Sequence, residues 1–122
     1  MNAKIRVRLM DDAREAYLTL KDQLDNKFNL TLFDSINSKI DVLKINCSAG
    51  IQIKKSRIPK KYLSEYAVTN LWKINLSNYW RMVYTIRQNQ RTEEIDVLEI
   101  FLEILDIIDH SKYNKVFGYK KK

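Results

Sequence analysis

The chain has 122 residues and a formal net charge of +7, from 22 Lys and Arg against 15 Asp and Glu. This length predicts one domain, residues 1–122, with a core that needs no metal or disulfide. Cys47 is the only cysteine, so no internal disulfide is expected and the composition suits the cytoplasm. No run reaches the ~20 apolar residues of a bilayer span, so we expect no membrane partner. The charge favours nucleic acid or acidic proteins as partners.

The N-terminal segment alternates basic and apolar residues from Lys4 to Leu9. This period of two predicts a half-buried strand and argues against a secretory leader. Asp12, with Glu15 in capping-box position, then predicts the start of a helix. Apolar residues at helical spacing continue that helix to about residue 24.

A second apolar stripe at helical spacing runs from Leu32 to Leu43 and predicts a second helix. Thr31 and Ser35 are its candidate N-caps. Two amphipathic helices joined by a short polar link should pack as an antiparallel hairpin. The following segment, residues 47–62, is basic and contains the only proline, which predicts a connection with little regular structure.

The next region is rich in aromatic and β-branched residues, which predicts two strands joined by a turn. A turn of two residues after Leu76 would place Ile74 opposite Arg81 and bury a cation. A three-residue loop over 77–79 instead places Asn75 opposite Arg81, and the apolar pattern favours this register. The hairpin then has an apolar face of Trp72, Ile74, Leu76, Trp80, Met82 and Tyr84, and a polar face of Lys73, Asn75 and Arg81.

Residues 95–108 carry two overlapping patterns. Acidic residues recur at helical spacing, whereas isoleucine and leucine alternate as in a strand, so periodicity leaves both structures open. From His110 onward the sequence predicts a short turn or helix and then an aromatic, basic tail.

One known family has this order of elements. The segment Trp72-Lys73-Ile74-Asn75-Leu76, followed by Tyr79-Trp80-Arg81-Met82-Val83-Tyr84, resembles the central hairpin of the RelE/ParE family of type II toxin-antitoxin systems. Residues 107–113 resemble its closing strand and the histidine that often follows. The resemblance covers residues 68–122 in detail and the N-terminal half in pattern only. It implies an α+β fold in the order β-α-α-β-β-β, an N-terminal strand, a two-helix hairpin and an antiparallel β-meander, with a short C-terminal helix or tail. It also favours a strand at residues 95–108.

The resemblance implies a toxin that cuts mRNA on the ribosome, inhibits translation and is silenced by a cognate antitoxin. Cleavage without a metal needs a base for the 2′-hydroxyl, cations on the phosphate and an acid for the leaving 5′-oxygen. Arg81 matches the family arginine that contacts the scissile phosphate, and Lys73 matches a lysine of some members. His110 is the acid or base candidate, and Tyr113 is a candidate for base stacking or proton transfer.

A basic run lies upstream of the hairpin. We expect its cations to contact the RNA backbone, as we expect of Asn75 on the polar face of the hairpin. An ordinary solvated loop is the alternative for the basic run. The cations are Lys54, Lys55, Arg57, Lys60 and Lys61. No His and Cys cluster has metal-ligand spacing and no glycine-rich phosphate loop is present, so we expect neither a metal nor a small-molecule cofactor.

Two alternatives share this fold, because one scaffold hosts several activities. Asn75 stands where members that use Lys73 carry a second lysine, and Phe117 lies near the family's terminal tyrosine. Both residues favour a ParE-like toxin that acts on DNA gyrase without nuclease activity. The other alternative is a non-toxic basic module that binds RNA or protein.

Overall fold

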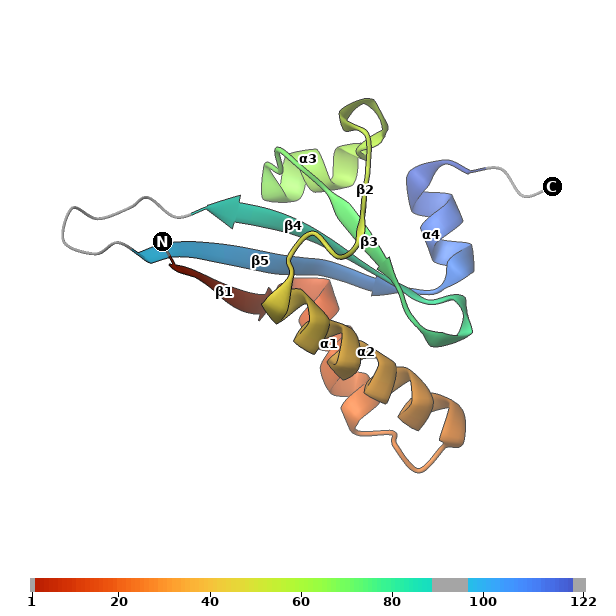
Figure 1. The fold of residues 1–122 in the computed structure, drawn as a ribbon. Coiled ribbons are helices and arrows are strands. Elements are labelled where there is room, and N and C mark those ends of the chain that lie inside the picture. Colours follow the sequence, from red (N-terminus) through yellow and green to blue (C-terminus); the bar gives the residue numbers. More distant parts are fainter. Residues whose placement is uncertain (1, 89–96, 120–122) are drawn as a thin grey trace.

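The computed structural model describes residues 2–88 and 97–119 and has a five-stranded mixed sheet at its centre (Figure 1). The strands lie in the order β1-β5-β4-β3-β2. β1 is parallel to β5, and the other neighbouring pairs are antiparallel. Their bounds are β1 Asn2–Leu9, β2 Ile51–Gln52, β3 Trp72–Asn75, β4 Arg81–Gln88 and β5 Val97–Ile108. β5 lies between β1 and β4, and this inner position explains why residues 102–108 are all buried.

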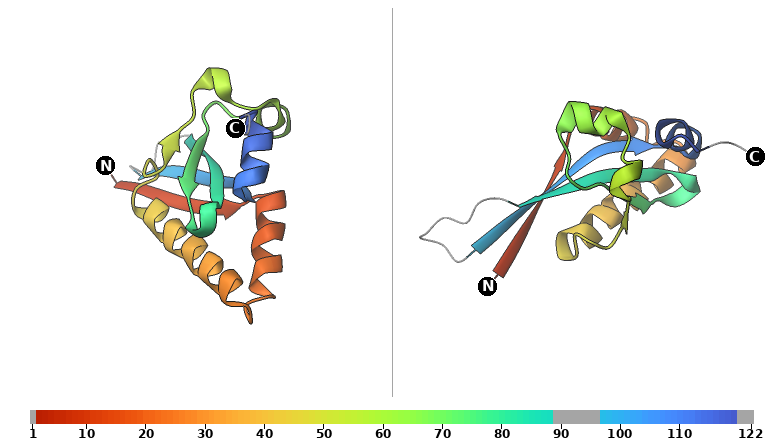
Figure 2. Two further views of the ribbon diagram at one scale, coloured as in Figure 1. Left: turned by 90° about the vertical axis from the view of Figure 1, so that its right-hand side faces the viewer. Right: turned by 90° about the horizontal axis from the view of Figure 1, so that it is seen from above.

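Helices cover both faces of this sheet within the described ranges. α1, Asp11–Lys21, and α2, Lys27–Ile45, lie on one face and form a V joined at its point (Figure 2). α3, Lys60–Tyr66, and α4, His110–Phe117, lie on the other. None of these helices has the length and apolar character needed to cross a membrane.

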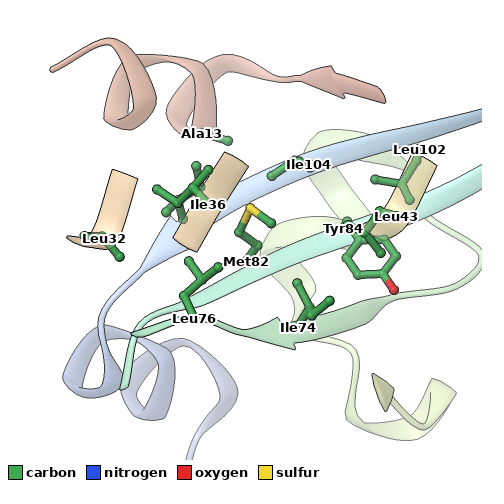
Figure 3. Close-up of a cluster of buried hydrophobic side chains, with 11 residues drawn as sticks. Ala13, Leu32, Ile36, Leu43, Ile74, Leu76, Met82, Tyr84, Leu102 and Ile104 are labelled. Atoms are coloured by element: carbon green, nitrogen blue, oxygen red, sulfur yellow. The ribbon is translucent and has the colours of Figure 1, made fainter. Parts of the chain in front are cut away.

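The larger core cluster lies between the sheet and the α1–α2 pair, as Figure 3 shows. Every second side chain of β3 and β4 points into it, because side chains alternate across a strand. Burying one such aliphatic side chain contributes about 1.5–3 kcal/mol. The fully or nearly fully buried members are Ala13, Leu32, Ile36, Leu43, Ile74, Leu76, Met82, Tyr84, Leu102, Ile104 and Ile107.

A second cluster fills the opposite face, beneath α3 and α4. It includes Tyr62 of α3, Val83 of β4 and Tyr113 of α4, all at most 2% exposed. The polar face predicted for the hairpin is therefore partly covered, and Arg81 is half-buried there instead of lying on open sheet.

A β-bulge in β5 links the two faces. Val83 pairs with Asp106 and Tyr84 pairs with Ile104, so Leu105 is the extra residue. A bulge places two successive side chains on one side of the strand. Leu105 and Asp106 both face α3, where Asp106 accepts hydrogen bonds from Tyr62 Oη at 2.7 Å and Lys61 Nζ at 3.0 Å.

The N-terminal strand and the two-helix pair were predicted correctly, but the predicted caps were wrong. α1 begins at Asp11 after Met10, which makes no side-chain cap, and Asp11 and Asp12 lie in the first turn, where carboxylates interact well with the helix dipole. α2 begins earlier than predicted, at Lys27. Asn26 caps it by accepting from the backbone nitrogens of Phe28 and Asn29, which leaves Thr31 and Ser35 inside the helix.

The hairpin register is confirmed: Asn75 pairs with Arg81, and Leu76 N donates to Trp80 O across the loop. The strand interpretation is also confirmed over the described part, 97–108, while residues 95 and 96 lie outside the described residues. Residues 47–62 are more regular than predicted, since β2 and the start of α3 lie there. The described sheet is thus a β3-β4-β5 meander extended by β2 at one edge and by parallel β1 at the other.

Candidate functional site

The predicted arginine and histidine meet where β4 begins and α4 starts. Arg81 Nη1 lies 3.1 Å from His110 Nδ1 and donates to Tyr79 O at 3.3 Å. The other imidazole nitrogen, Nε2, lies 3.2 Å from Asn114 Nδ2. β5 ends at Ile108, opposite Arg81, so the first residue of α4 necessarily comes close to the guanidinium.

Tyr113 supports both cations of the site. Its ring centroid lies 4.5 Å from Arg81 Cζ and 5.1 Å from Lys73 Nζ. The ring is stacked on Phe117 at 4.3 Å and is only 2% exposed. A cation over an aromatic face is stabilised by about 0.5–2 kcal/mol, more as it is desolvated. One aromatic ring thus holds two like charges on the same side of the sheet.

These two cations lack an acidic partner in the part of the chain that is described. No carboxylate there lies within 4.0 Å of either Lys73 Nζ or the Arg81 guanidinium. Desolvation, and then the charge of Arg81, lower the pKa of Lys73 below its ordinary value. Like charges held together in a partly desolvated place form a natural binding site for an anion.

The Tyr113 hydroxyl is buried and has no hydrogen-bond partner among the described residues. Burial raises the pKa of Tyr113 to about 12, with Arg81 acting in the opposite direction. The phenol is therefore uncharged at neutral pH and presents its ring face, not its oxygen, to the cations.

The contact with Arg81 restricts where His110 carries its proton. A guanidinium only donates hydrogen bonds, so Nδ1 accepts and any proton of a neutral imidazole is on Nε2. Nε2–H then donates to the Asn114 side-chain amide, which presents its oxygen to the imidazole. This arrangement leaves Nδ1 unprotonated and ready to accept a proton.

The loop after β3 places an exposed aromatic beside the site. Asn78 and Tyr79 have φ values of 56° and 63°, a left-handed conformation that costs a non-glycine residue roughly 1–2 kcal/mol. Ser77 N donates to Ser35 Oγ of α2 at 3.0 Å, which anchors the loop. Tyr79 is nevertheless 78% exposed, and its ring centroid lies 6.2 Å from that of His110.

The basic run is only partly available for binding. The cations of residues 54–60 are exposed, on the segment leading into α3. Lys61 is instead engaged with the buried carboxylate of Asp106. Asn75 is exposed opposite Arg81. Among the described residues, no hydrogen bond joins any of these side chains to the Arg81–His110 pair.

Sequence reasoning missed two residues of the site. Asn114 follows His110 by four positions in α4, and this spacing brings side chains together on a helix. Tyr79 carried no comparable signal, because its exposure depends on the left-handed turn. Within residues 2–88 and 97–119, no three His, Cys, Asp or Glu side chains are grouped so as to hold a metal ion.

The site and fold were compared with known proteins. No protein family matches the chain, and neither does any curated protein or solved structure.

Proposed function

We propose that this chain is the toxin of a type II toxin-antitoxin system and cuts ribosome-bound mRNA by metal-free attack of a 2′-hydroxyl on the adjacent phosphate. The observation that carries the proposal is the Arg81–His110 contact of 3.1 Å beside Lys73, which has no carboxylate partner among the described residues. The resemblance of residues 68–122 to the RelE/ParE family supplies the reaction class.

Arg81 and Lys73 would bind the scissile phosphate. The planar fork of a guanidinium matches two phosphate oxygens, and the ammonium adds a point charge. Both cations stabilise the negative charge that grows on the phosphate as the 2′-oxygen attacks. Phosphate binding also relieves the repulsion between the two cations, which is the physical reason to expect affinity here.

His110 would exchange one of the two protons in the reaction. The 2′-oxygen forms a bond to phosphorus and loses its proton, while the bond from phosphorus to the 5′-oxygen breaks and that oxygen gains a proton. The products are a 2′,3′-cyclic phosphate and a 5′-hydroxyl. When phosphate oxygens compete for the N–H groups of Arg81, Nδ1 of His110 is released to accept a proton. Lys73, with its lowered pKa, is the candidate for the second transfer.

The test is expression of the chain without an antitoxin, followed by primer extension on cellular mRNA. We expect growth arrest and discrete cuts that depend on translation. Arg81→Ala should lower the cutting rate about 10²–10³-fold, the effect of removing one donor to a developing oxyanion. Arg14→Ala is the matched control, because it removes the same charge from the exposed face of α1.

The variant must be shown to fold, because Arg81 packs on Tyr113 and is not on an open surface. Circular dichroism and thermal melting of Arg81→Ala and Arg14→Ala provide that check. Persistent cutting by a folded Arg81→Ala protein contradicts the proposed site.

A second candidate is the ParE-like toxin that acts on DNA gyrase. Asn75 supports it, because this exposed amide lies opposite Arg81 where a second phosphate-binding cation would help cleavage. Growth arrest with intact mRNA and trapped gyrase complexes is its expected signature. Normal growth at a confirmed expression level supports the non-toxic binding module. For both toxin functions we expect an acidic antitoxin that covers the cations.

A further inference from the structure

We propose that Tyr79 is the stacking platform for the nucleobase next to the phosphate held by Arg81, and that it sets the base preference of the cut. This inference rests on the proposed function and adds a base-binding subsite to it.

The position of Tyr79 links it to the reacting groups in two ways. Its carbonyl oxygen accepts a hydrogen bond from Arg81 Nη1 at 3.3 Å, and the same nitrogen contacts His110. Its ring centroid lies 6.2 Å from that of His110, with the two planes at 60°. A base stacked on this ring is therefore within one nucleotide of a phosphate on the guanidinium.

The backbone that carries the ring is anchored on both sides. On one side Ser77 is anchored to Ser35 of α2, and on the other Trp80 packs into the larger core cluster. Trp80 N donates to Ser77 O at 3.2 Å, which closes the loop. Between these fixed ends the backbone adopts a strained left-handed conformation that leaves the Tyr79 ring 78% exposed. Strain without compensating burial is typical of functional positions.

A hollow beside the ring is large enough for a nucleobase and is lined partly by side-chain amides. Its volume is about 620 Å³, within the roughly 300–1,000 Å³ range of ligand pockets. Two exposed amides, Asn75 and Asn78, lie on it together with Tyr79. An asparagine amide both donates and accepts, which suits the edge of a purine, most of all adenine. Stacking on tyrosine accepts any base but favours the larger purine face.

The experiment measures cutting in a translating extract with a panel of mRNAs that differ in one base on either side of the cut. Wild type, Tyr79→Ala and Tyr79→Phe are compared. Because stacking is worth about 1–3 kcal/mol per base, Tyr79→Ala should lower kcat/KM roughly 5- to 150-fold and flatten the purine preference. Tyr79→Phe keeps the ring face and should keep both rate and preference.

The outcomes separate this inference from the function on which it rests. No cutting by the wild type removes the proposed nuclease and this subsite together. Normal cutting by Tyr79→Ala, with unchanged base preference, overturns the platform alone. Normal cutting by Tyr79→Ala combined with loss of inhibition by the antitoxin shows that the ring contacts a protein partner, and it also overturns the platform. Melting of each variant confirms that the loop change leaves the fold intact.

Discussion

Replacing Tyr113 by phenylalanine should stabilise the protein and leave cutting intact. The hydroxyl is buried without a partner among the described residues, and such a group costs about 1–3 kcal/mol. The aromatic face beneath Arg81 and Lys73 is unchanged by the substitution, so the phosphate-binding cations keep their places. We expect a gain of about 1 kcal/mol at pH 7, which corresponds to a rise of roughly 3–5 °C in Tm for a domain of this size.

The same substitution should flatten the alkaline loss of stability. Burial raises the pKa of Tyr113 from its ordinary value of 10.0 to about 12. The phenol therefore loses its proton at lower pH in the unfolded chain than in the folded chain, and stability falls as pH rises between these values. This difference in the pKa of Tyr113 corresponds to a loss of about 2–3 kcal/mol in the free energy of unfolding at high pH. Tyr66 and Tyr84, with pKa values also raised to about 12, contribute with the same sign in both proteins and cancel in the difference.

Urea unfolding at pH 7, 10 and 11 measures both effects, and primer extension measures cutting. Tyr113→Leu is the informative comparison: it removes the ring face and the stacking on Phe117, and we expect it to lower both stability and cutting. Loss of cutting in a stable Tyr113→Phe protein would show that the hydroxyl takes part in the chemistry. A less stable Tyr113→Phe protein would show that the hydroxyl has a partner, and either result refutes the role of Tyr113 as a support.

Three further predictions concern neighbouring residues. Lys73→Met should slow cutting yet raise stability at neutral pH in urea titrations. Desolvation lowers the pKa of Lys73, so the charged lysine destabilises the wild-type protein at neutral pH. This cost disappears only as pH rises towards the unfolded pKa of 10.5. Asp106→Asn should lower the free energy of unfolding by about 1.5–3 kcal/mol, since it weakens charge-assisted bonds from Lys61 and Tyr62, while the cutting rate per folded molecule stays unchanged. Tyr79→Gly should raise stability by about 0.5–1 kcal/mol in thermal melts through relief of its positive φ, but should weaken cutting. An equal loss of cutting in Asn78→Gly, which relieves similar strain and keeps the ring, would contradict that last interpretation.

Much of the sheet could be predicted because the sequence patterns that determine strand pairing lie close together along the chain. The apolar alternation around the loop over 77–79 determined the register, since only one pairing keeps Arg81 off the larger core cluster. α3 could not be predicted in this way. It is a short, lysine-rich helix that ends at Ala67 in a left-handed conformation, without the glycine that usually marks a helix end. Its main tether, from Lys61 and Tyr62 to Asp106, is far away in the sequence.

The site was predictable to a similar degree. The family resemblance selected Arg81 and His110. The segment after residue 110, predicted as a short turn or helix, is α4, and it brings Tyr113 and Asn114 to the side of His110. The sequence did not reveal which side chains hold the cations of the site and of the basic run in place. The tyrosine lies under the cations with its oxygen buried, and one lysine of the basic run is committed to a carboxylate. Both facts depend on α3 and α4 covering a sheet face that the alternation pattern made polar.

The bulge at Leu105 reverses which side chains of β5 face the larger core cluster. Before it, even-numbered side chains such as Leu102 and Ile104 face α1 and α2; after it, the odd-numbered Ile107 does. If all these residues were kept but paired with β4 without the bulge, the side chains after Leu105 would turn over, sending Asp106 into the apolar core and Ile107 out of it. The imidazole follows two positions after that strand, so its meeting with the guanidinium depends on the bulge, which sets Ile108 opposite Arg81.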